Sequence, residues 1–120
     1  MEVETRNLTV SDIYLKLVAI KFAKGIYFWV GDENLSYNDL QCAFPLKNIK
    51  DEDSTGTTLI GELDSLSLDI SKALAKRYGM PIFMSINVQD SDYLILKELQ
   101  EKLFKTIFEL FPLNKDPHTN

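Results

Sequence analysis

The sequence predicts an α+β fold, namely a single two-layer domain with a sheet of about six largely antiparallel strands and two helices on one face. Two observations support this prediction. Strand-like segments joined by short turns fill the first half of the chain, and the second half follows the order helix, strand, helix. The chain has 120 residues, which suits one domain of the usual roughly 100–200 residues. We expect this domain to span residues 1–112 and a tail to follow over residues 113–120.

Six segments have the β-branched and aromatic composition that is typical of strands. The expected strands are Thr5–Val10, Ile13–Phe22, Ile26–Val30, Asp39–Phe44, Thr57–Gly61 and Ile82–Val88. Charged residues, Ser, Thr and Gly fill Lys47 to Thr58 without apolar periodicity, so we expect residues 47–58 to form a flexible surface loop.

A helix is predicted from about Ser65 to Tyr78, because apolar residues recur there at helical spacing. Asp64 or Ser65 can cap its start, since a short side-chain oxygen can accept from a free N–H of the first turn. Gly79 can take the left-handed conformation that ends a helix, and Pro81 prevents continuation.

A second helix is predicted from about Ser91 or Asp92 to Phe111, with Asp90 and Ser91 as candidate caps. Its polar face carries ion pairs at i,i+4 spacing, Glu98 with Lys102 among them. Its apolar residues form one stripe, which should pack on the sheet. The stripe consists of Leu96, Leu99, Leu103, Ile107, Leu110 and Phe111.

The segment Ile26–Val30 is apolar on both of its faces, whereas a strand with one wet face alternates. Two helices can cover only one face of a six-stranded sheet, and the sequence suggests no further element for the other face. We therefore predict that a partner chain covers the second face, which makes it a dimer interface. A half-closed barrel, in which the sheet covers itself, is the alternative.

Alternation along the strands predicts which side chains meet the partner. The even positions of Ile82–Val88 are all apolar and suit the helix face. Tyr and Trp combine a large apolar area with a polar end, as interfaces favour. The predicted partner-facing set is Tyr27, Trp29, Phe83, Ser85 and Asn87. For Ser85 and Asn87 the alternative is local bonding to backbone within one chain.

Composition excludes several classes of function. The net charge is −5 and the pI is about 4.8, which argues against binding to nucleic acid or to an anionic membrane surface. The longest apolar run, Ile26–Val30, is far shorter than the ~18 residues that a membrane span needs. Cys42 is the single cysteine, so no intrachain disulfide is possible. With no signal peptide at the acidic N-terminus, we expect a cytoplasmic or nuclear protein.

The sequence offers little for catalysis, and we expect a protein that is not an enzyme and holds no cofactor or metal. The single histidine, His118, lies in the predicted tail, where it cannot be held within about 3 Å of a substrate proton. Cys42 therefore has no His partner and is expected to be a small core residue. The five glycines are too scattered for a phosphate-binding loop. The sequence also has too few cysteines and histidines to form a zinc site.

Four segments, taken in order, resemble the proteasome assembly chaperone 4 family. They are the aromatic strand Gly25–Gly31 ending in Trp-Val-Gly, the Ser/Thr-rich Ser54–Gly61, the helical Leu74–Arg77, and Pro81–Asp92 with its Phe-Met-Ser-Ile-Asn-Val-Gln core. The order and spacing hold from about residue 8 to residue 111. The loop at 47–56 and the N-terminal strands depart from the family pattern.

The resemblance implies a small non-catalytic chaperone. Such proteins pair with a chaperone 3-type partner of the same fold and help α-type subunits to form the ring of the proteasome core particle. They dimerise through their sheets with the helices outside, and a homodimer is possible when the chain is isolated. The alternatives are a roadblock- or longin-like dimeric trafficking adaptor and, less favoured, a small enzyme or ligand-binding domain.

Overall fold

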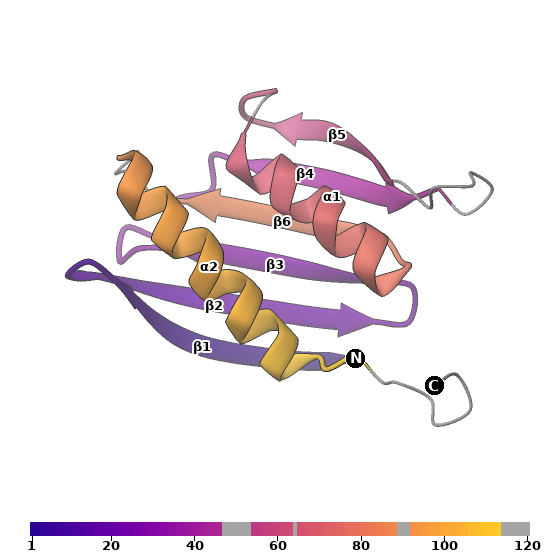
Figure 1. The fold of residues 1–120 in the computed structure, drawn as a ribbon, viewed down its shortest axis with the longest axis horizontal. Helices are drawn as coiled ribbons and strands as arrows, with labels where there is room; N and C mark the ends of the chain where they lie inside the picture. Colours follow the sequence, from indigo (N-terminus) through magenta and orange to yellow (C-terminus); the bar gives the residue numbers. More distant parts are fainter. Residues whose placement is uncertain (47–53, 64, 89–91, 114–120) are drawn as a thin grey trace.

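The computed structural model describes residues 1–46, 54–63, 65–88 and 92–113. These residues form one six-stranded mixed sheet with two helices on the same face (Figure 1). The strands are β1 (Glu2–Val10), β2 (Ile13–Phe22), β3 (Gly25–Gly31), β4 (Leu40–Pro45), β5 (Ser54–Ile60) and β6 (Ile82–Asn87), and the helices are α1 (Leu66–Tyr78) and α2 (Tyr93–Leu110).

The strands lie in the order β1-β2-β3-β6-β4-β5. Neighbouring strands are antiparallel except for β3 and β6, which are parallel. The parallel pair arises because α1 carries the chain back across the sheet and inserts β6 between β3 and β4. The predicted α+β class with a largely antiparallel sheet is confirmed, with this one parallel pair added.

Most predicted elements agree with the structure, but the predicted loop over residues 47–58 is wrong in its second part. Residues 54–58 belong to β5, which pairs with β4 at one edge of the sheet. An edge strand needs no apolar alternation, and the β-branched threonines Thr55 and Thr57 suit pairing with Phe44 and Cys42. Residues 47–53 lie outside the described residues, as does the predicted tail from residue 114 onward.

Both helices begin at a capping side chain, and α1 also ends at a capping residue. The Ser65 hydroxyl accepts a hydrogen bond from the backbone N–H of Leu68 at 3.3 Å, and Gly79 ends α1 with a left-handed φ of 68°. The Asp92 carboxylate accepts from the backbone N–H of Leu94 at 2.8 Å at the start of α2. The other candidate caps, Asp64, Asp90 and Ser91, lie outside the described residues.

The core lies between the helices and the inner face of the sheet, meaning the face that the helices cover. Alternate residues of β3 and β6 point inward and are fully buried. The apolar stripe of α2 packs on them, with Leu99, Leu103 and Ile107 completely buried. The inward residues of the two strands include Ile26, Phe28, Val30, Ile82 and Met84.

Tyr78 joins the ends of the two helices. Its hydroxyl donates to the backbone oxygen of Phe111 at 2.7 Å, and its ring lies against that of Phe108. Burial raises the pKa of Tyr78 to about 12, so the phenol stays protonated and keeps this hydrogen bond at neutral pH.

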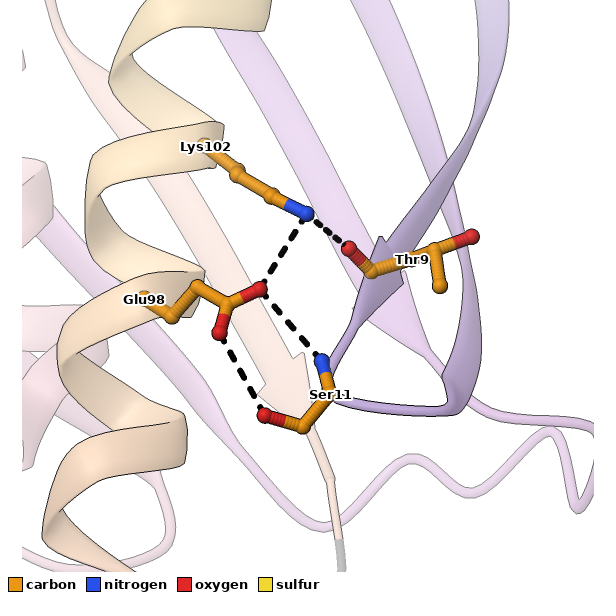
Figure 2. Close-up of polar contacts among 4 residues, drawn as sticks. All are labelled: Thr9, Ser11, Glu98 and Lys102. Carbon is orange, nitrogen blue, oxygen red and sulfur yellow. Dashed lines mark hydrogen bonds and ion pairs between the residues drawn. The ribbon is translucent and has the colours of Figure 1, made fainter.

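Glu98 attaches α2 to the turn between β1 and β2 (Figure 2). Ser11 and Asp12 both have positive φ there, at 46° and 48°, which the right-handed twist of a tight hairpin favours but non-glycine residues resist. The Glu98 carboxylate accepts hydrogen bonds from the Ser11 N–H and hydroxyl, both at 3.3 Å, and pairs with Lys102 at 3.1 Å. Lys102 also donates to the Thr9 carbonyl. These contacts hold the turn against the helix.

Replacing Leu103 with alanine tests which face of α2 is buried. We expect Leu103→Ala to lower the free energy of unfolding by about 2–5 kcal/mol, because it leaves a cavity in a fully buried site. Denaturant unfolding measures this loss. The control Leu94→Ala, at an exposed site of the same helix, should change it by less than about 0.5 kcal/mol. A similarly small loss for Leu103→Ala would contradict the packing described here.

The Glu98 contacts predict a pH-dependent stabilisation. The hydrogen bond from Lys102 and those from Ser11 lower the pKa of Glu98. A folded-state pKa below the unfolded value means that the stabilisation is present above the unfolded pKa and is lost as the pH falls through the folded one. We expect Glu98→Gln to lower the thermal midpoint at neutral pH and to match the wild type in acid. An equal difference at every pH would show that the charge of Glu98 is not involved.

Candidate partner interface

The outer face of the sheet, meaning the face without helices, carries the five residues that the sequence predicts to meet a partner. In the parallel β3–β6 pair, Tyr27 lies beside Phe83, Trp29 beside Ser85, and Gly31 beside Asn87. Since side chains alternate along each strand and the intervening residues are buried under the helices, all of these point away from the helices. The structure thus brings the five residues together on one face.

The connection between β3 and β4 folds over part of this face, and we call residues Asp32–Asp39 the strap. The Trp29 indole N–H donates to the backbone oxygen of Ser36 at 3.2 Å, and the hydroxyls of Tyr27 and Tyr37 lie 2.7 Å apart. The expectation that this chain has no element for its second face is therefore wrong. A segment without apolar periodicity provides part of the cover.

Asp39 fixes the end of the strap to the sheet. One of its carboxylate oxygens accepts from the backbone N–H of Ile86 at 2.9 Å, and the other accepts from the Gln41 side-chain amide at 2.9 Å. The Asp39 side chain thus satisfies an N–H of β6 just before β4 begins at Leu40. Because Asp39 is buried, loss of either bond would leave a polar group without a partner, at a cost of about 1–3 kcal/mol.

Ser85 and Asn87 are buried under the strap. The Asn87 side chain accepts from the backbone N–H of Asn38 at 2.7 Å and donates to the Ser85 hydroxyl at 2.7 Å. The alternative considered for these residues, bonding to backbone within one chain, is therefore present for Asn87, whereas Ser85 bonds to the Asn87 side chain. Ser85 and Asn87 can therefore affect the binding of a partner only by holding the strap in place.

The ring of Trp29 lies over Gly31. A Cβ atom placed on Gly31 would come within 2.4 Å of the ring, so no larger residue fits without displacing the indole. Together with the strap, this packing leaves Trp29 only 9% exposed. The indole is thus a covered residue of this chain and offers little surface to another molecule.

Four of the exposed or partly exposed aromatic residues on the outer face form one group, and we call them the aromatic patch: Phe22, Tyr27, Tyr37 and Phe83. Tyr14 and Phe44 are also exposed on this face but lie outside the patch. Their contacts make them continuous, since the rings of Phe22 and Phe83 are 6.4 Å apart and Tyr27 lies beside Phe83 in the sheet. Burial, followed by the Tyr37 hydrogen bond, raises the pKa of Tyr27, so its phenol is neutral. Phe22 and Tyr37 were missed by the sequence prediction. The hairpin register opposite Gly25 could have placed Phe22, but nothing in the sequence marks Tyr37.

The model of the family described as proteasome assembly chaperone 4 matches residues 14–88, from β2 to the end of β6. The chain belongs to the proteasome assembly chaperone 4 family. Its fold is similar to a chain in the crystal structure of a chaperone complex for yeast 20S proteasome assembly, with a TM-score of 0.61 and 18% identity over 92% of this chain and 95% of that chain. No curated protein matches the chain in sequence.

Membership of the proteasome assembly chaperone 4 family makes this chain a non-catalytic assembly chaperone and not an enzyme. Cys42 is buried, and burial raises the pKa of its thiol, which disfavours the reactive thiolate. His118 lies outside the described residues. Within the part of the chain that the structure describes, no group of three His, Cys, Asp or Glu residues could hold a metal ion. Of the helices in that part, neither is long and apolar enough to cross a membrane.

Replacing Gly31 tests how the strap and Trp29 pack. We expect Gly31→Ala to lower the free energy of unfolding by about 1–3 kcal/mol, because the added methyl group overlaps the indole. Trp29 is the single tryptophan, so its emission should shift to the red at the same time as the ring becomes more exposed. Unchanged stability together with unchanged emission would contradict this packing.

Proposed function

We propose that this chaperone pairs through its outer face with a chaperone 3-type subunit, and that the pair promotes assembly of the α-subunit ring of the proteasome core particle. The observation that carries the proposal is the aromatic patch, an uncovered apolar surface on the sheet of a proteasome assembly chaperone. The similar yeast structure is itself a chaperone complex, which supports a paired form.

The geometry of the outer face suits a second sheet. Face-to-face sheets pack about 10 Å apart with interdigitating side chains, and the helices lie on the opposite face, where they do not obstruct this approach (Figure 1). Aromatic anchors in the centre of an interface commonly carry most of the binding energy. Of the predicted set, Tyr27 and Phe83 supply such anchors directly. Trp29, Ser85 and Asn87 support the strap beside them.

The remaining parts of the proposal concern other partners and location. The surface that the two chaperones form together would bind α-type proteasome subunits. The isolated chain would use the same outer face to form a homodimer. We propose a cytoplasmic or nuclear location, which the free thiol of Cys42 supports because proteins of reducing compartments rarely form disulfides.

Replacing Phe83 tests the interface. We expect Phe83→Ser to weaken binding to the chaperone 3-type subunit by about 30-fold or more, the effect of losing about 2 kcal/mol at a central anchor. Isothermal titration calorimetry with the purified subunits measures it. The matched control is Tyr93→Ser, which removes an exposed aromatic residue from α2 and should bind as the wild type does. Equal affinities for both variants would contradict an outer-face interface.

A pull-down from cell extract, analysed by mass spectrometry, extends the same test to the function. The tagged wild type should recover the chaperone 3-type subunit and α-type proteasome subunits. Phe83→Ser should recover much less of the chaperone 3-type subunit. Recovery of a GTPase or a coat complex in place of proteasome subunits would overturn the proposed function.

A further inference from the structure

Leu35, in the strap, has a conformation and an exposure that the fold of this chain does not explain. Its φ is 53°, in the left-handed region that glycine and asparagine adopt readily and leucine resists. Its side chain is 70% exposed, so little apolar surface is buried in return. A residue that breaks a local rule without a gain inside its own chain points to function.

The turn that holds Leu35 does not depend on a leucine side chain. The backbone N–H of Leu35 donates to the Asp32 carbonyl at 3.1 Å, and the N–H of Asn34 donates to the Asp32 carboxylate at 3.0 Å. An asparagine or a glycine at position 35 would make the same backbone bond with less strain. The contacts of this turn therefore do not account for a leucine at position 35.

Leu35 stands at the rim of a recess on the outer face. The recess has a volume of about 470 Å³, and its other lining residues include Thr9, Tyr14, Lys16 and Gly31. Tyr14, like Leu35, is strongly exposed, so a tyrosine and a leucine flank a recess whose other lining residues are largely polar. Two residues further along the strap, Tyr37 belongs to the aromatic patch. Along β3, Trp29 lies between Gly31 of the recess and Tyr27 of the aromatic patch, so the recess and the patch lie on the same face of the sheet.

We propose that Leu35 is a partner-contact residue, which the closed strap presents to an apolar surface of the same subunit that covers the aromatic patch. This inference rests on the proposed function. Hydrogen bonds with Trp29, with Asn87 and with the Ile86 N–H hold the strap to the sheet, so opening it would expose Trp29 and break these bonds. A segment held in this way offers its leucine with little loss of conformational entropy on binding.

The variant Leu35→Asn separates the role in binding from any role in folding. Asparagine tolerates the left-handed conformation, so the thermal midpoint should stay equal to that of the wild type or rise. Affinity for the chaperone 3-type subunit, measured by calorimetry, should fall by about tenfold, as for an apolar anchor. The matched control is Leu94→Asn, which removes a leucine of 71% exposure from α2 and should leave the affinity unchanged.

The outcomes distinguish this inference from the proposed function. Weaker binding of Leu35→Asn with an undiminished thermal midpoint supports the inference. Unchanged or tighter binding of Leu35→Asn, together with loss of binding in Phe83→Ser, overturns the inference and leaves the proposed function standing. Tighter binding would mean that the strap moves aside for the partner. A wild-type chain that binds no chaperone 3-type subunit, or that only associates with itself through Leu35, overturns both.

Discussion

The central strand β3 carries apolar side chains on both faces, and the rest of the structure depends on covering both of them. On the inner face, Phe28 and its neighbours are buried under the two helices. On the outer face, the ring of Trp29 lies over Gly31 and is bonded to the strap. The insertion of β6 beside β3 extends both surfaces, since its residues continue each face in register. Apolar area of this extent would otherwise stay in water, at a cost of roughly 25 cal/mol for each Å².

Local signals in the sequence were enough to predict the helices and most of the strands. Gly79 and Ser65 act through backbone groups within a few residues, so a short window of sequence contains the whole physical cause of the helix ends. The position of β6 between β3 and β4 depends on contacts between distant segments, which no local pattern records. The strand β5 was placed partly in a loop because its stability comes from pairing with β4 and not from its own periodicity.

The assignment of side chains to faces was predictable, but their partners were not. Because side chains alternate along each strand, Tyr27, Trp29 and Phe83 can be assigned to one face without knowing what covers that face. A polar end on an aromatic ring suits a partner chain and an internal hydrogen bond equally well, and the strap supplies the internal acceptor for Trp29. The strap has no periodicity, so its path could not be read from the sequence. Its end at Asp39 is fixed by a bond to the N–H of Ile86, a residue of a distant segment, and only the folded chain creates this contact.

The strap also determines how the outer face can be used. Strap residues form the hydrogen bonds of the Trp29 indole N–H and the Asn87 side-chain oxygen, so a second chain would not have to bond these groups. The strap leaves the aromatic patch uncovered, and the binding energy of the proposed partner would come from a few such anchors rather than from a matched set of hydrogen bonds. An interface of this kind can be strong or weak according to how many anchors fit. Substitutions at Leu35 or Phe83 would therefore adjust the affinity while the hydrogen bonds that hold the strap stay in place.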